Sequence, residues 1–138
     1  MVTVYDVRAE DLIKKAVEKL KELGEIKPPE YVKYVKTGTD KERAPESKDF
    51  WYIRCASLLR KIYLTPTGVS KLRVYYGGRK EHSVGREHHA DAGGSIIRKG
   101  LQQLEKLGFI AKGKKGRVIT SKGRAFLDNI AHEVKKGS

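Results

Sequence analysis

Lysine and arginine are the chemically active side chains that dominate this sequence, and they are concentrated in its second half. Residues 1–49 carry 11 basic and 11 acidic side chains, whereas residues 50–138 carry 19 basic and 6 acidic ones, so the whole formal net charge of +13 arises there. A surface that only keeps a protein in solution mixes both signs, so this segregation predicts a docking face for a polyanion. Nucleic acid is the first candidate. An anionic membrane is the second, but the apolar helix faces that it would need are required for the core.

Two stretches concentrate these cations. An expected helix from Ala90 to Leu107 has an apolar face and a polar face, and the polar face begins with groups that bond to phosphate or to base edges, namely Ser95, Arg98, Lys99, Gln102 and Gln103. The segment from Lys112 to Arg124 then carries six basic residues and no acidic one. We therefore predict that this helix and the segment after it form the centre of the docking face.

Other kinds of chemistry have little support in the sequence. His88 and His89 lie in an expected loop from Arg79 to Gly93, without the thiolate or carboxylate partners at the fixed spacing of a zinc site, so no metal is predicted. Cys55 is the only cysteine, which excludes a disulfide framework and favours a reducing cytosol. No carboxylate pair, activated nucleophile or phosphate-cradling loop is recognisable, so we predict neither a catalytic site nor a cofactor. The N-terminus lacks a signal segment and no run is long enough to span a bilayer, so we expect a soluble cytoplasmic protein.

The segment from Phe50 to Leu64 is the element that must position these groups. Eleven of its fifteen residues are apolar or aromatic, which is typical of a helix buried at the centre of a domain. Arg54, Lys61 and the neighbouring Arg60 occupy the polar strip that remains. We expect this strip to join the polar face of the 90–107 helix in one basic surface.

The order of the predicted elements is that of a winged helix-turn-helix. A helix at 9–23 and a long polar connection precede the central helix, and a short helix at 69–76 follows it. The 90–107 helix would be the reading helix, and short strands at 109–112 and 117–120 would form the wing. A last helix, capped by Thr120 or Ser121, returns to the core. We therefore expect a single, mainly α domain over residues 1–138, built around a central helix, with one short two-stranded β-hairpin.

Two functions are compatible with this arrangement: a transcription regulator that docks in a DNA groove, and a structural protein that uses the same surface on RNA. A DNA-binding regulator normally dimerises to read two half-sites, yet no spare apolar helix is left for a dimer interface. This favours a monomer that binds RNA.

Several motifs resemble the e-type family of the archaeal and eukaryotic ribosomal small-subunit protein numbered nineteen. They are KPPEYVKYVKTG at 27–38, WYIRCASLLRKIYL at 51–64, VYYGGRK at 74–80, HH at 88–89, GGSIIRKGLQQLEKLGF at 93–109 and GRVITSKGRAFLDNIA at 116–131. The match covers nearly the whole chain and suggests an archaeal member.

The resemblance implies a non-catalytic protein that is bound to rRNA in the head of the small subunit, beside other small-subunit proteins, and that supports maturation of the subunit. It favours contact through phosphate neutralisation and stacking. The predicted RNA-binding residues are Arg54, Arg60, Lys61, Lys71, Arg73, Arg79, Lys80, Arg86, His88, His89, Arg98, Lys99, Lys112, Lys114, Lys115, Arg117 and Lys122.

Overall fold

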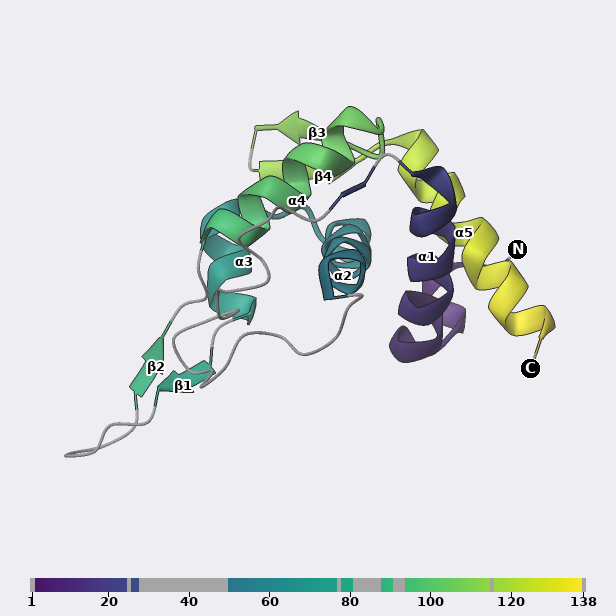
Figure 1. Ribbon diagram of the computed structural model, residues 1–138, viewed down its shortest axis with the longest axis horizontal. Coiled ribbons are helices and arrows are strands. Elements are labelled where there is room, and N and C mark those ends of the chain that lie inside the picture. Colours follow the sequence, from purple (N-terminus) through teal and green to yellow (C-terminus); the bar gives the residue numbers. More distant parts are fainter. Residues whose placement is uncertain are drawn as a thin grey trace.

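The computed structural model describes residues 2–24, 26–27, 50–76, 78–80, 88–90, 94–114 and 116–137, with the backbone alone described at 78–80 and 88–90. It confirms the mainly helical fold (Figure 1). None of the described helices is long and apolar enough to cross a membrane. In chain order the elements are η1 Val4–Asp6, α1 Ala9–Leu23, α2 Phe50–Leu64, α3 Val69–Tyr76, β1 Gly78–Lys80, β2 His88–Ala90, α4 Gly94–Lys106, β3 Ile110–Gly113, β4 Gly116–Ile119 and α5 Ser121–Lys136.

Helix α2 is the predicted central helix, with the predicted bounds. It lies between α1 and α4, and Figure 1 views it nearly along its axis. Trp51, Cys55, Leu58, Leu59 and Ile62 are each at most 1% exposed. Burying a large apolar side chain of this kind stabilises a fold by about 1.5–3 kcal/mol, so α2 contributes a large share of the core. Burial also raises the pKa of the Cys55 thiol to about 12, which keeps this cysteine neutral and unreactive.

Helix α1 is amphipathic, as predicted, and ends at Gly24. Leu12, Ala16 and Leu20 are buried on the side that packs against α2 and α5. Its outer lysines pair with acidic residues: Lys15 lies 3.4 Å from Glu18, and both Lys15 and Lys19 approach Glu133 of α5, at 3.9 and 3.6 Å. The charges of this part of the molecule are therefore largely balanced within it.

Helices α3 and α4 and the β3–β4 hairpin confirm the winged arrangement. The hairpin is antiparallel, with Ile110 opposite Ile119. Thr67, in the turn before α3, pairs with Arg117 of β4: the Thr67 N–H donates to the Arg117 carbonyl at 3.2 Å and the Arg117 N–H donates back at 2.8 Å. Gly116 makes this approach possible, because its φ is +119° and a Cβ there would lie 2.5 Å from the carbonyl carbon of Thr67. The wing is thus joined to the turn that starts α3.

The structure differs from the sequence-based expectations in three places. Two short strands lie in and next to the expected loop from Arg79 to Gly93: β1 starts at Gly78 and pairs antiparallel with β2, which places Gly78 opposite Ala90. Helix α4 accordingly starts at Gly94 and not at Ala90. In the wing, Gly113 pairs with Gly116, so the hairpin turn is shorter than the expected four residues.

The start of helix α5 lies close to Phe109, the residue before β3 of the wing. Thr120, one of the two predicted caps, is its N-cap, and its hydroxyl oxygen accepts a hydrogen bond from the Gly123 N–H at 3.2 Å. A Cβ on Gly123 would collide with the carbonyl oxygen of Phe109, which is a rigid backbone atom. Gly123 therefore sets the distance between α5 and the start of the wing.

We predict that Gly123→Ala lowers the free energy of unfolding by about 2 kcal/mol or more, because the backbone must shift to admit the methyl group. Urea denaturation followed by circular dichroism measures this change. Ser121→Ala, at an exposed position in the same helical turn, is the control and should change it by less than about 0.5 kcal/mol. Equal stabilities for the two variants would contradict the close approach.

Candidate nucleic-acid interface

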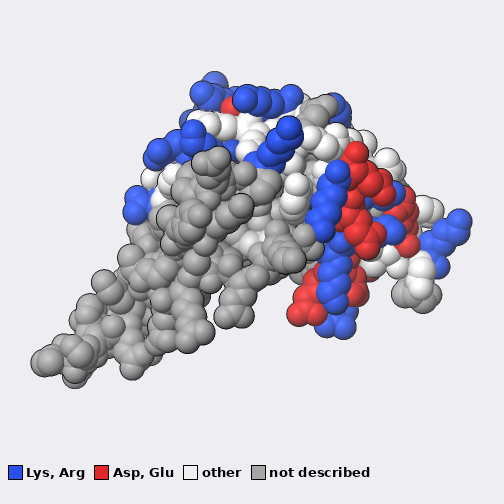
Figure 2. All heavy atoms as spheres, in the orientation of Figure 1, with Lys and Arg blue, Asp and Glu red and all other residues white. Residues whose placement is uncertain are grey.

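The outer face of α4 carries a row of exposed polar and basic side chains, and the one acidic residue of this helix, Glu105, is partly buried and paired with Arg117. Arg98, Lys99 and Gln102 were predicted there, and Lys106 extends the row by another turn. Their spacing of three and four residues keeps them on one side of the helix. Lys106 was missed, although the same periodicity points to it. Figure 2 shows lysine and arginine atoms gathered over α4 and the β3–β4 hairpin, whereas both signs alternate over α1.

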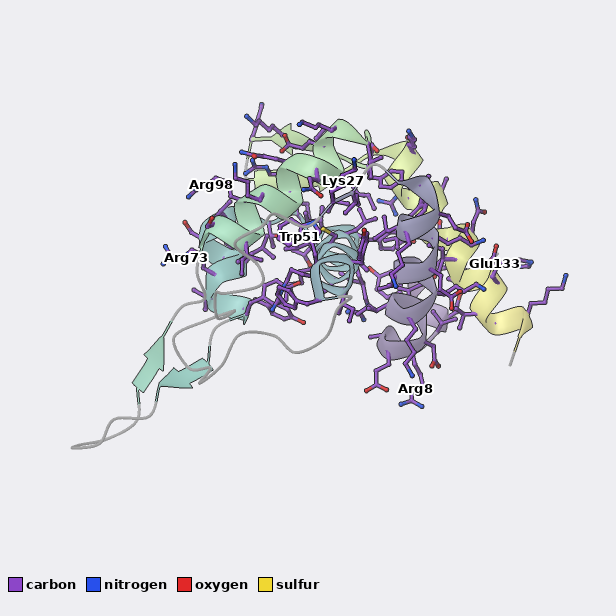
Figure 3. The ribbon with its side chains drawn as sticks, in the orientation of Figure 1. Arg8, Lys27, Trp51, Arg73, Arg98 and Glu133 are labelled. Atoms are coloured by element: carbon purple, nitrogen blue, oxygen red, sulfur yellow. The ribbon has the colours of Figure 1, made fainter. Side chains whose placement is uncertain are left out.

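Helix α3 brings further cations to the start of α4. A Cβ built on Gly94 would lie 3.3 Å from Arg73 Cδ and 3.7 Å from Arg98 Nη2, so both arginines pass close to this glycine. Figure 3 shows Arg73 and Arg98 on the same side of the molecule, on neighbouring helices. Lys71 is exposed on α3 as well. Of the predicted residues, Arg73 of α3 and Arg98 of α4 are therefore brought together.

The wing divides into exposed cations and cations used within the fold. Lys112 and Lys114 are exposed. Arg117, by contrast, donates from Nε to Glu105 Oε1 of α4 at 2.8 Å, and the two side chains are only 18% and 23% exposed. Arg117 therefore attaches β4 to α4.

Lys122, at the start of α5, also bonds within the protein. Its ammonium donates to the Leu107 carbonyl at 2.8 Å and lies 5.5 Å from the centre of the Phe109 ring. The Leu107 carbonyl follows the last turn of α4, where carbonyl groups lack helical partners, and a lysine is favourable there. Lys122 therefore caps the C-terminal end of α4.

The polar strip of α2 is half covered by α3. The Arg54 guanidinium lies 4.0 Å from the centre of the Tyr76 ring, and Lys61 Nζ lies 4.5 Å from that of Tyr75. Ser57 and Tyr76 share a hydrogen bond of 2.6 Å between their hydroxyl groups. Desolvation lowers the pKa of Arg54 and raises that of Tyr76, although a guanidinium stays charged at any physiological pH. These cations hold α3 against α2 through cation–π contacts.

Arg60, the third cation of the strip, is also half-buried. Its Nε atom is buried and has no hydrogen-bond partner among the described residues. The strip is thus not an open basic edge of the kind that the sequence suggested.

Gln103 has a packing role that the sequence did not reveal. Its side-chain oxygen accepts from the indole N–H of Trp51 at 3.0 Å and from the backbone N–H of Lys27 at 3.3 Å, while its amide nitrogen donates to the Lys27 carbonyl at 2.8 Å. Figure 3 shows Trp51 and Lys27 beneath α4. This amide is engaged with the protein and is not presented outward with Arg98 and Lys99.

The remaining predicted residues are placed by the backbone or lie outside the described residues. Arg79 is opposite His89 and Lys80 is opposite His88 in the β1–β2 ladder. Arg86 and Lys115 fall outside the described part of the chain.

We predict that Arg117→Met lowers the free energy of unfolding by about 1–2 kcal/mol, because Glu105 would keep a mostly covered carboxylate without its partner. Lys112→Met, on the neighbouring strand, removes the same charge from an exposed position and should change it by less than about 0.5 kcal/mol. Thermal denaturation of the two variants checks the difference, and an unchanged Arg117→Met midpoint would refute the attachment role.

Comparison with known proteins identifies the family to which the chain belongs. A family profile described as Ribosomal protein S19e matches residues 3–137. The small ribosomal subunit protein eS19 of Aeropyrum pernix is 44% identical over 97% of this chain and 90% of that protein. The eS19G protein of Ascaris suum is 41% identical (97% and 93% covered), and the eS19 protein of Thermoplasma acidophilum is 39% identical (99% and 91% covered). The chain belongs to the ribosomal protein S19e family, whose proteins are structural, non-enzymatic components of the small ribosomal subunit.

Proposed function

We propose that this chain binds small-subunit rRNA through the outer face of α4 and the exposed part of the wing. The observation that carries the proposal is the exposed row Arg98, Lys99, Gln102 and Lys106 of α4, whose neighbouring acid Glu105 is neutralised by Arg117. Lys112 and Lys114 of the wing accompany this row. Lysine and arginine that neutralise phosphates supply most of the affinity for a nucleic acid and fix the orientation of the protein on it. The whole chain, residues 1–138, acts as one rRNA-binding domain in the head of the subunit and supports assembly and maturation of its rRNA.

The predicted contact residues contribute in two ways. The exposed cations Lys71, Arg98, Lys99, Lys112 and Lys114 neutralise phosphates, and Arg73 lies beside them. The engaged cations act mainly by holding the elements of this surface in place. This second group comprises Arg54, Lys61, Arg117 and Lys122. The other predicted residues stay predicted contacts with rRNA; they are Arg60, Arg79, Lys80, Arg86, His88, His89 and Lys115.

A DNA-binding regulator is the second candidate, because the winged arrangement of α3, α4 and the hairpin also suits a DNA groove. Membership of a ribosomal protein family favours RNA.

We expect the purified chain to cosediment with small subunits that lack it, at moderate salt, and to bind duplex DNA much more weakly under the same conditions. A family member bound to structured rRNA should recognise the shape and phosphate positions of that RNA, which a regular DNA duplex does not offer. Ultracentrifugation with quantification of the bound chain measures both. Sequence-selective binding to DNA without incorporation into subunits would overturn the proposal in favour of the regulator.

We expect Arg98→Glu to weaken rRNA binding by about tenfold and to reduce the slope of log affinity against log salt by about 1, because one phosphate contact is lost. The melting temperature should stay nearly unchanged, since Arg98 is exposed. Filter binding across a salt series measures the slope. Lys136→Glu, which makes the same charge change at the exposed end of α5, is the control and should bind almost like the wild type. A large loss of stability in Arg98→Glu, with an unchanged salt slope, would mean that Arg98 is structural.

A further inference from the structure

A groove lies between α1 and the first turn of α2, away from the basic row of α4. It has a volume of about 630 Å³. Ile53 of α2 is 39% exposed there, and Ile13 of α1 is half-buried. The described residues that line it are Glu10, Ile13, Lys14, Val17, Glu18, Lys21 and Ile53.

The charged lining of the groove alternates in sign along α1. Glu10, Lys14, Glu18 and Lys21 follow one another at intervals of three or four residues, so they form a ladder along one side of the helix. Glu10 and Glu18 have salt-bridge partners, Arg8 at 3.5 Å and Lys15 at 3.4 Å, but both carboxylates are well exposed. Exposed pairs of this kind are worth well under about 1 kcal/mol and are easily exchanged for new partners.

This lining disfavours RNA and favours protein. A phosphate backbone entering the groove would meet two carboxylates as well as two lysines, so the charges of the lining give it no net attraction. Ile13, Val17 and Ile53 offer no hydrogen bond to sugar or phosphate. An amphipathic helix satisfies both parts of the lining, because its apolar stripe covers the isoleucines and its flanking charges of both signs complement the ladder.

We propose that this groove docks an amphipathic helix of another protein in the same particle; this inference rests on the proposed function of the chain as a bound component of the small subunit. The rRNA contacts made by α4 and the wing hold the chain beside its neighbours. Because the rRNA contacts tether the chain, the partner helix has a high effective concentration at the groove, so even a small apolar contact keeps the groove occupied.

A second copy of this chain fits the groove less well. A stable dimer normally buries about 1,600 Å² of total surface, most of its central part apolar. Among the described residues the groove offers three apolar side chains, and Val17, at 7% exposed, is already mostly buried and contributes little. The contact therefore suits a partner that is held in place by other means.

The test compares Ile53→Asp with the wild type in two binding assays that use the full chain. The first uses small-subunit particles that lack this protein, and the second uses protein-free rRNA extracted from the same particles. Asp is tolerated in the first turn of a helix, so the variant should fold, and its melting temperature checks this. Leu23→Asp is the matched control, because Leu23 is 43% exposed on α1 but does not line the groove. Ile53→Ser removes the apolar contact without adding a charge.

Ile53→Asp and Ile53→Ser should both bind the particles about fivefold more weakly than the wild type and the Leu23→Asp control, with an unchanged affinity for protein-free rRNA. Equal losses in both assays would mean that the groove contacts RNA, and no loss in either would mean that it docks nothing. Sedimentation equilibrium that shows a dimer of the wild type, dissolved by Ile53→Asp, would assign the groove to a second copy. Each of these three results overturns the proposal. A wild-type chain that binds neither particles nor rRNA would overturn the proposed function, and this inference with it.

Discussion

The burial of α2 is the constraint on which the rest of the structure depends. Trp51 is 1% exposed, and its indole N–H needs an acceptor, because an unpaired buried donor costs about 1–3 kcal/mol. Gln103 of α4 supplies that acceptor and also bonds the backbone of Lys27. The buried residues Ile97, Leu101 and Leu104 set the rotation of α4 about its axis, and Gln103 fixes it from the edge of that buried face, so Arg98 and Gln102 face outward. The core contact therefore orients the basic row.

The net charge overstates how many cations are free to meet a polyanion. Arg54 and Lys61 lie over tyrosine rings, Lys122 caps the C-terminal end of α4, and Arg117 pairs with Glu105. Each of these contacts joins two elements, so the same residue type builds the scaffold in one place and the proposed RNA surface in another. The two groups differ in their surroundings: an engaged cation has a ring, carboxylate or carbonyl within reach, whereas Lys112 of β3 is exposed.

The helices and the wing could be predicted from the sequence because their periodicity and caps are local signals. The limits of α1, α2 and α3 agree with the structure, and Thr120 caps α5 as expected. The strands β1 and β2 were missed, since three residues are too few to show an alternating pattern and each residue pairs with a partner 8 to 12 positions away. The role of Gln103 could not be predicted either, because its partners lie 52 and 76 residues away in the chain.

The position of the wing relative to α4 is fixed by contacts within the protein that leave no unpaired charge on the surface. The paired backbones of Thr67 and Arg117 join the wing to the turn before α3, and the Arg117–Glu105 pair joins it to α4. Gly116 allows the first of these contacts because any side chain would strike the Thr67 backbone. Lys112 and the α4 row are therefore held at a set separation before any RNA is bound. A rigid spacing of this kind favours folded RNA whose phosphates already match it, since neither partner loses much conformational freedom on binding.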